Sequence, residues 1–243
     1  MSVVFTLCTA VCISHKMNIT IITLMPEMYP GPLAQSLIGD ALAKGIFTLD
    51  ILPLRQFGVG VHQKVDDSPA GGGAGMVLMP QVVDAAIEQA KAKNPGAQLI
   101  HFSPRGERMS QPLLKELAQK DLILLCGRYE AVDERVLEKH EPREVSLGDF
   151  VLTGGDIPAM ALIDGCVRLL PGVVGKEASL GEESFGDGDY AALLEYPHYT
   201  KPAIWEGREI PPILTSGHHE NVRKWRLEQA RAITKARRPD LLK

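Results

Sequence analysis

The sequence predicts an α/β fold in which a mostly parallel β-sheet is covered by helices on both faces. Short apolar, β-branched runs of strand length alternate with stretches that have helical spacing. This alternation is typical of sheets built from β-α-β units. The first run, NITIITL, is also uncharged throughout, as expected for a strand that is buried on both sides.

The expected elements follow one another along the first 170 residues. The prolines and the glycine that follow the first strand end it, and Gly45 ends the helix that comes next. Strands are expected at 18–24, 47–55, 98–103, 121–126 and 143–152. Helices are expected at about 33–44, at about 81–92, from about 111, from about 133, and at 157–170.

Three loops that follow strands contain glycine: PRGERMS, GRYEAVD and TGGD. In open parallel sheets, ligands bind beyond the carboxyl ends of the strands, where all three loops should lie. Any one of them is equally consistent with a tight turn, but three at one edge favour a ligand that is recognised by backbone groups, such as an adenine edge. The dinucleotide fingerprint GxGxxG does not follow the first strand, and AGGGAGM is not followed by the Lys-Ser/Thr of a P-loop.

Charge is unevenly distributed along the chain. From Lys201 onward there are ten Lys or Arg and five Asp or Glu, which gives a net charge of +5. Because the whole chain has a net charge of −4, residues 1–200 have a net charge of −9. This asymmetry favours a basic module that binds a polyanion, although a solvated basic helix face is the alternative. The Gly- and acid-rich stretch 175–192 is expected to be a flexible linker, and residues 193–243 a small helical domain.

The four cysteines do not form a CxxC pair, which argues against a zinc site or a disulfide framework and fits a reducing cytoplasm. Residues 1–16 lack the basic start and the cleavage pattern of a secretory signal and are too short to span a bilayer. We expect them to be an extension before a domain that begins at Met17, and we expect no membrane association.

Five blocks of the sequence, in order, resemble successive motifs of one enzyme family. The blocks are VDDSPAGGGAGMVLMP, SPRGERMSQPLLKELA, LLCGRYEAVDERV, EVSLGDFVLTGGDIPAM and LLEYPHYTKPAIWEGREIPPILTSGHHENVRKWR. The family is that of the bacterial tRNA (guanine-N(1))-methyltransferases (TrmD), of the knotted SPOUT class, and the resemblance covers nearly all of residues 17–242. It implies a homodimer with the active site at the subunit interface, a deep trefoil knot in residues 17–174, and methylation of guanine 37 in tRNA.

The resemblance also implies that S-adenosyl-L-methionine lies bent in the knot, with its adenine held by backbone groups. Ala131 stands where the family usually has glycine, and Phe150 where it usually has tyrosine, so side-chain polar contacts at these two points are in doubt. The implied cofactor-binding residues are Pro104, Gly106, Gly127, Tyr129, Glu130, Ser146, Leu147, Gly148, Phe150, Leu152, Gly154, Gly155 and Pro158.

Methylation of guanine N1 requires a base that removes its proton and a positive group that stabilises the charge developing on O6. By the resemblance, Arg168 is the positive group. Glu183 stands where the family has the aspartate base, and the extra residues of the linker leave Asp187 and Asp189 as alternative bases. The resemblance further implies a magnesium requirement, for which the sequence shows no ligand pattern; His218 and His219 give little support for a metal pair.

The remaining expected contacts are to the tRNA, whose target base must be exposed in a loop or flipped out. Basic side chains of the tail would bind phosphates, with a steep dependence on salt. The expected substrate-binding residues are Asp66, Gly73 and Gly75 beside the guanine, His198, Tyr199 and Lys201 in PHYTK, and Arg223, Lys224, Arg226, Arg231 and Lys235 on phosphates. A knotted methyltransferase for another RNA base, or a non-catalytic RNA-binding protein, are the alternatives.

Overall fold

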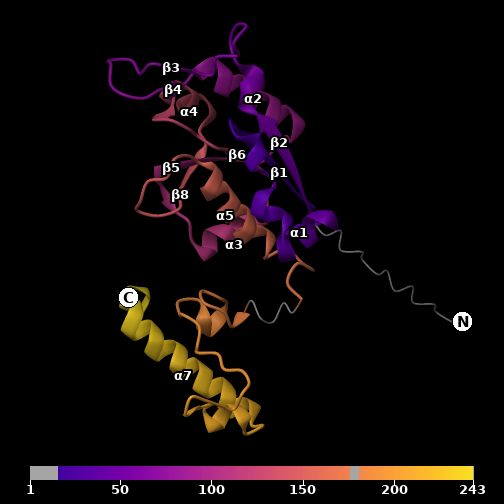
Figure 1. Cartoon of the computed structure of the whole chain (residues 1–243), viewed down its shortest axis with the longest axis vertical. Coiled ribbons are helices and arrows are strands. Elements are labelled where there is room, and N and C mark those ends of the chain that lie inside the picture. Colours follow the sequence, from indigo (N-terminus) through magenta and orange to yellow (C-terminus); the bar gives the residue numbers. More distant parts are fainter. Residues whose placement is uncertain (1–15, 176–180, 243) are drawn as a thin grey trace, which may run out of the picture. The chain divides into compact units, whose positions relative to one another are not determined.

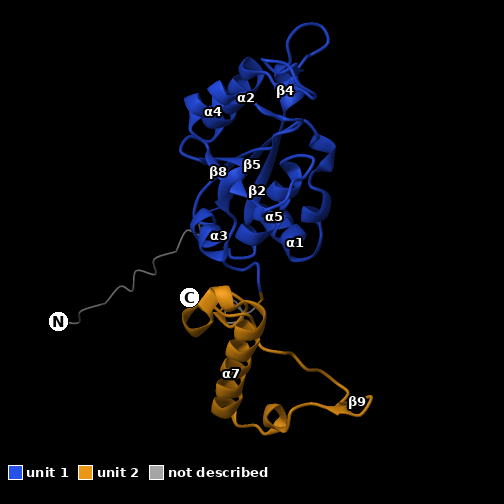
Figure 2. Cartoon of the chain, turned by 90° about the vertical axis from the view of Figure 1, so that its left-hand side faces the viewer, with its two compact units in different colours: residues 1–174 blue, residues 175–243 orange. Residues whose placement is uncertain are grey.

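A computed structural model describes residues 16–175 and 181–242 of the chain (Figure 1). The chain divides into two compact units, residues 1–174 and 175–243 (Figure 2). The expected extension, residues 1–16, lies outside the described residues apart from Lys16. Within the described ranges, no helix is both long enough and apolar enough to cross a bilayer.

The first unit is built on a five-stranded sheet in which every pairing is parallel. Its strand order is β2-β1-β6-β5-β8. This arrangement confirms the predicted mostly parallel sheet. The strands are β1 (Met17–Thr23), β2 (Phe47–Pro53), β5 (Gln98–Arg108), β6 (Leu122–Leu125) and β8 (Arg143–Ser146).

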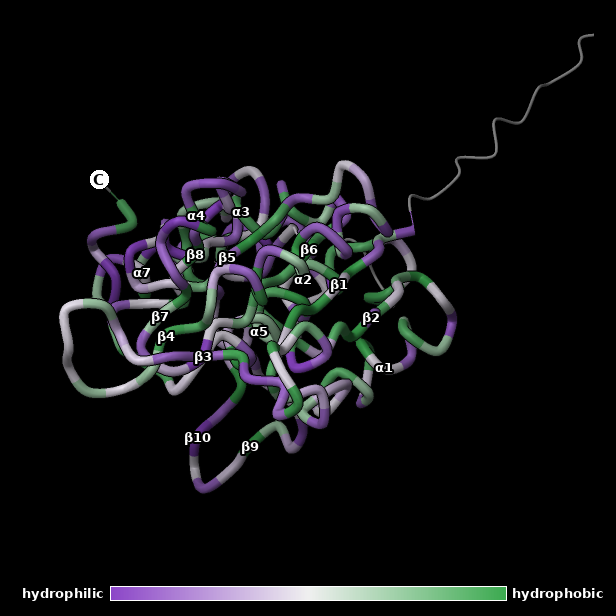
Figure 3. The backbone as a smooth tube through the Cα atoms, turned by 90° about the horizontal axis from the view of Figure 1, so that it is seen from above, coloured by the Kyte–Doolittle hydropathy of each residue, from purple (hydrophilic) through white to green (hydrophobic). Residues whose placement is uncertain are grey.

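Helices cover both faces of this sheet, because its strands carry apolar side chains on both sides. Along β1, Ile19 and Ile21 join one buried cluster, whereas Ile22 joins another on the opposite face. The first cluster includes residues of α1 (Ser36–Ala43), α3 (Gln111–Leu117) and α5 (Asp156–Val167). The second includes residues of α2 (Pro80–Lys93) and α4 (Glu134–His140). Figure 3 colours much of β1, β2 and β6 as hydrophobic.

A small second sheet lies beside the first. It joins β3 (Asp66–Asp67), β4 (Val77–Leu78) and β7 (Ala131–Val132), with β3 and β4 antiparallel. β4 and β7 come from distant parts of the chain. The pairing therefore ties the long glycine-rich loop between β3 and β4 to the loop that follows β6.

The second unit has a small core that supports one long helix, α7 (His219–Arg237). Tyr190, Leu193, Tyr196 and Ala230 are its buried apolar residues, and Leu227 packs against them. A short hairpin is formed by β9 (Ile204–Trp205) and β10 (Arg208–Glu209). The 3₁₀ turns of the chain are Pro26–Met28, Gly31–Ala34, Leu54–Phe57, Gly188–Tyr190, Pro212–Thr215 and Pro239–Leu242.

Several expected boundaries differ from the structure. The strand expected at 98–103 continues to Arg108, so most of the expected loop PRGERMS belongs to β5. The strand expected at 47–55 ends at Pro53. The strand expected to continue to Leu152 ends at Ser146, and Val151 beyond it is exposed. The helix expected from Leu33 begins at Ser36, after a 3₁₀ turn that contains Pro32. In the stretch expected as a linker, residues 176–180 lie outside the described ranges, but Tyr190 packs into the core of the second unit. The signal in the sequence that could have indicated this packing is Tyr190 itself, an aromatic residue among glycines and acidic residues.

Candidate functional site

A cavity of about 290 Å³ lies beside the irregular middle part of β5 and the loops that follow β6 and β8. Backbone and apolar groups make up much of its wall, including Phe102, Val132 and Val145. It brings together residues 103–105 of β5 and the loops that follow β6 and β8, and such loops are where parallel sheets bind ligands. The expected cofactor-binding residues that line it are Pro104, Gly127, Tyr129, Glu130, Ser146, Leu147, Gly148, Phe150, Leu152, Gly154, Gly155 and Pro158.

Gly106 is the expected cofactor-binding residue that does not line this cavity. β5 bulges away from β8 between Phe102 and Glu107, both of which are in register with Val145. Ser103 and Pro104, inside the bulge, line the cavity. A Cβ on Gly106 would lie 2.4 Å from the backbone carbon of Glu144. Its glycine therefore lets the bulge close against β8.

The loop before α5 lies directly against the loop after β6. The backbone N–H of Gly155 donates to the carbonyl of Gly127 over 2.9 Å. A Cβ on Gly155 would lie 2.9 Å from Cα of Cys126, closer than real Cβ atoms come to backbone. Beside them, Tyr129 has φ of +62°, a left-handed conformation that a bulky residue adopts at a cost. The wall of the cavity thus includes both a close backbone approach and a left-handed tyrosine.

A buried ion pair holds these two loops together. Nε and Nη2 of Arg128 donate to Oδ2 of Asp156 over 2.9 and 2.6 Å, and the Asp156 side chain is 1% exposed. The other carboxylate oxygen accepts from Oγ1 of Thr23 at 2.6 Å and from the hydroxyl of Tyr29 at 3.2 Å. Burial raises the pKa of the neighbouring Cys126 thiol and the pKa of Tyr29, so both stay neutral.

The sequence did not predict this network. The sequence features that could have indicated it are Asp156, which follows the glycine pair in TGGD, and Arg128 in GRYE. The partners are 28 residues apart in the chain and meet only because the loops fold onto one another.

His101 is a second residue that the sequence did not single out. It is a histidine between apolar residues in the run LIHF of β5, it is 6% exposed, and it lines the cavity. Burial is the main cause of the lowering of its pKa, which keeps the imidazole neutral at pH 7. Among the described residues, its Nδ1 has no hydrogen-bond partner.

The segment from β3 to β4, which is expected beside the guanine, contacts Glu130 at the wall of the cavity. A Cβ on Gly75 would lie 2.4 Å from Oε1 of Glu130, and the backbone N–H of Glu130 donates to the carbonyl of Met76 at 3.0 Å. Asp66 lies in β3 at the other end of the loop, and Gly73 has φ of +121° within it. A further cavity of about 780 Å³ lies between this loop and α4, and it shares residues 131, 132 and 134 with the first.

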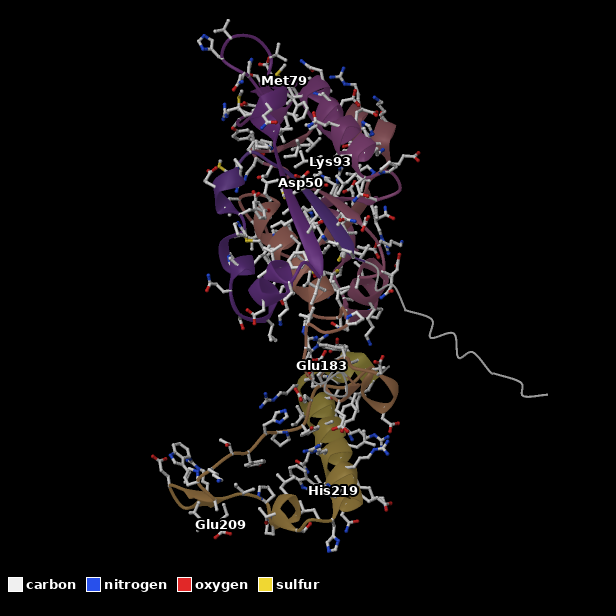
Figure 4. The ribbon with its side chains drawn as sticks, turned by 90° about the vertical axis from the view of Figure 1, so that its right-hand side faces the viewer. Asp50, Met79, Lys93, Glu183, Glu209 and His219 are labelled. Atoms are coloured by element: carbon white, nitrogen blue, oxygen red, sulfur yellow. The ribbon has the colours of Figure 1, made fainter. Side chains whose placement is uncertain are left out.

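The two expected catalytic residues lie in different units. Arg168 caps the C-terminus of α5 in the first unit. Glu183 lies in the second unit, ahead of the packed Tyr190, and is labelled in Figure 4. Asp187 and Asp189 precede Tyr190 in the same segment, and Asp189 lies 3.8 Å from Arg223.

The basic side chains of the second unit fall into two groups. Arg223 and Lys224 are on the exposed surface of α7, each near an acidic residue. Arg226 instead lies over the Tyr196 ring, 4.7 Å from its centre, and donates to Glu182 at 3.2 Å. Its guanidinium thus packs against the core, because Arg226 lies four residues before the buried Ala230, on the same face of α7. The other expected residues, Lys201, Arg231 and Lys235, are exposed.

The aromatic residues of PHYTK lie close to this helix and to one another. His198 pairs with Glu195 at 2.9 Å and stacks near Tyr196. The Tyr199 ring lies 6.4 Å from that of Trp225 on α7. The motif is therefore attached to α7 through aromatic contacts, and Tyr199 remains about half exposed.

One cluster of the described residues has the composition of a metal site: Asp84, Glu88 and His140. The ammonium of Lys139 lies 2.6 Å from Oδ1 of Asp84, and that of Lys91 lies 3.1 Å from Nδ1 of His140. These cations satisfy the atoms that a metal would need, so the cluster is a hydrogen-bonded link between α2 and α4.

Comparison with known proteins identifies the family. The profile described as tRNA (Guanine-1)-methyltransferase TrmD matches residues 17–243. A tRNA (guanine-N(1)-)-methyltransferase of Ruegeria pomeroyi is 57% identical over 223 residues, which cover 91% of this chain and 90% of the relative. Proteins with the same name from Rhodospirillum rubrum and Agrobacterium fabrum are each 52% identical, over 93% and 92% of this chain and 92% and 94% of their own lengths. The chain belongs to the tRNA (guanine-1)-methyltransferase family.

Proposed function

We propose that this protein transfers a methyl group from S-adenosyl-L-methionine to N1 of guanine 37 in tRNA. The observation that carries the proposal is the cavity beside the bulge of β5 and the loops after β6 and β8, which gathers nearly all of the expected cofactor-binding residues. Family membership gives the reaction, and the cavity gives a place for the methyl donor in this chain.

The composition of the cavity suits an uncharged heterocycle. Phe102, Val145 and Leu152 provide apolar surface, and the glycines expose backbone N–H and C=O groups at close range. The bound donor would supply a methyl group on a positively charged sulfur with a good leaving group. Of the acidic residues at the wall, Glu134 is engaged by Arg105 at 3.1 Å, so Glu130 would offer its oxygens to Mg²⁺.

A trefoil knot in the first unit is part of the proposal. β6 and β8 are separated in the sheet by β5, yet Gly154 and Gly155, after β8, pair with Arg128 and Gly127, after β6. The chain must therefore pass the end of β5 before α5 begins. This crossing supports the knot that membership of the SPOUT class implies.

In the proposed reaction, the carboxylate of Glu183 removes the N1 proton of guanine, and the guanidinium of Arg168 stabilises the charge on O6. Proton removal makes N1 a nucleophile, because its lone pair is then available for in-line attack on the methyl carbon. A fixed positive charge beside O6 lowers the barrier most where water is excluded. Asp187 and Asp189 are the alternative bases.

A homodimer would complete the site. Tyr129, Phe150 and Val151 line the cavity and are 50, 55 and 84% exposed. Large exposed apolar side chains at a site are characteristic of an interface, and a second copy of the chain would bury them. The second unit would bind the tRNA through the exposed cations of α7.

The test is a methylation assay on an unmodified tRNA transcript, with mass spectrometry of the nucleosides. We expect 1-methylguanosine from a transcript with guanine 37 and no product from one with adenine 37. Another methylated base would favour a different knotted methyltransferase. Normal binding of the methyl donor without any methylated product would favour a non-catalytic RNA-binding protein.

A further inference from the structure

His101 has a polar atom that the protein itself does not satisfy. Its side chain lines the donor cavity, the residue is only 6% exposed, and Nδ1 has no partner among the described residues. Buried polar atoms are nearly always hydrogen-bonded, because an unpaired one loses its hydration without compensation. An unpaired nitrogen at a ligand cavity therefore points to a partner on the ligand.

The surroundings of the imidazole define what this partner must offer. A Cβ on Gly127 would lie 3.3 Å from Cε1 of His101, so the ring packs against the glycine that opens the loop after β6. Nδ1 is the ring nitrogen without a partner, and in the neutral imidazole it is an acceptor when Nε2 carries the proton. The facing titratable groups are Glu144, Arg105 and Glu134, and none of them forms a hydrogen bond with the ring.

We propose that Nδ1 of His101 accepts a hydrogen bond from an N–H or O–H group in the adenosine half of the methyl donor. This inference rests on the proposed function. A neutral, buried acceptor suits a neutral donor, such as the adenine amino group or a ribose hydroxyl. The ammonium of the methionine half would instead need a carboxylate to offset the loss of its hydration. His101 is thus a specificity-determining residue of the cavity.

The test combines a protein change with changes in the ligand. The dissociation constant of S-adenosylhomocysteine is measured by calorimetry for the full-length wild type and for His101→Phe. The same pair of proteins is measured with the N6,N6-dimethyl, 2′-deoxy and 3′-deoxy analogues, each of which lacks one donor. We expect His101→Phe to bind the parent compound about 3- to 10-fold more weakly, as for one hydrogen bond.

The analogue that lacks the critical donor should bind the two proteins within about twofold of each other, by the logic of a double-mutant cycle. It also identifies which donor His101 recognises. His101→Asn, whose amide oxygen can take the place of Nδ1, should restore most of the selectivity. His140→Phe, a change at a buried histidine outside the cavity, should leave all the affinities unchanged.

Equal weakening toward the parent and all three analogues, or no weakening at all, would overturn the proposal. The partner of Nδ1 would then be a buried water shared with Glu144, whose Oε2 is also unpaired among the described residues. If the wild type bound neither S-adenosylhomocysteine nor S-adenosyl-L-methionine, the proposed function itself would fail. The two failures are therefore distinguishable.

Discussion

The two units use charge in opposite ways. In the first unit, Arg128 at the ligand cavity is paired internally with Asp156, whose side chain is 1% exposed. In the second, the charges of α7 face the solvent, as with Arg223 and Lys224, whose side chains are 73 and 67% exposed. The first unit is thus suited to a small ligand recognised by shape, and the second to a polyanion recognised by its field.

The residues expected to bind the methyl donor lie in one unit, whereas those proposed to act on guanine are divided between the two. Neither unit holds both of the residues proposed to act on guanine, since Arg168 belongs to the first and Glu183 to the second. Binding of the methyl donor should therefore survive damage to the second unit, whereas methyl transfer should not.

The largest expected effect is that of Glu183→Gln. Loss of the proposed base should lower kcat by at least about 100-fold, because positioned general bases contribute roughly 10²- to 10⁴-fold. The affinity for S-adenosyl-L-methionine, measured by calorimetry, should not change. Asp187→Asn and Asp189→Asn are the matched controls. Turnover close to normal in Glu183→Gln, with loss of turnover in one of the controls, would move the role of base to that aspartate.

Asp156→Ala should have the next largest effect, on stability. It leaves the guanidinium of Arg128, whose side chain is only 15% exposed, without its partner. The free energy of unfolding should fall by about 3–5 kcal/mol, as for other broken buried pairs. Urea denaturation followed by circular dichroism measures this loss.

The control for this change is an ion pair at the surface with a similar distance between its charged atoms. Asp50 and Lys93, labelled in Figure 4, are 2.7 Å apart, and their side chains are 40 and 62% exposed. Asp50→Ala should cost about 1 kcal/mol or less. Equal losses in the two variants would show that burial does not distinguish the two pairs.

A smaller effect is expected for the surface of the second unit. Arg223→Ala and Lys224→Ala should each weaken tRNA binding and reduce the slope of log K against log salt by about 0.7–0.9 for each phosphate that the variant no longer neutralises. Lys93→Ala, in the first unit, should leave the slope unchanged. Filter binding across a range of salt concentrations measures it. An unchanged slope in both α7 variants would exclude these cations from the RNA interface.

The smallest expected effect concerns Glu116, at the end of α3. Hydrogen bonds from Arg143 and Lys120 lower its pKa from 4.5 to about 2. The unfolded chain therefore binds a proton more readily than the folded one between these values, so the stabilisation is complete above pH 4.5 and disappears as the pH falls to about 2. The difference in Tm between wild type and Glu116→Gln should follow this course. A difference that is independent of pH would contradict it.

The sequence predicts the local features of the first unit and misses the contacts between distant segments. The apolar runs locate the strands, and the glycines locate the loops at the cavity, since both signals lie within a few residues. The pairing of Arg128 with Asp156 depends on the path of the chain between them, and no local pattern encodes it. Gly106 shows the same limit: its place in the motif is visible, but its contact with the β8 backbone is not.

In the second unit, two residues make contacts that composition alone does not indicate. Arg226 is expected to bind phosphate because it is basic, and its place four residues before the buried Ala230 also turns it toward Tyr196. Tyr190 was expected in a linker because its neighbours are glycine and acidic. In both cases, a contact with a residue elsewhere in the unit outweighs the character of the surrounding sequence.

The bulge of β5 allows the size of the cavity to change independently of the strand pairing in the sheet. Phe102 and Glu107 are both in register with the same residue of β8, so the residues between them are extra residues outside the strand pairing. An insertion or deletion among these extra residues would change the wall around the ligand and leave the sheet in register. Related chains could in this way accept larger or smaller donors by insertion or deletion at one point, without rebuilding the domain.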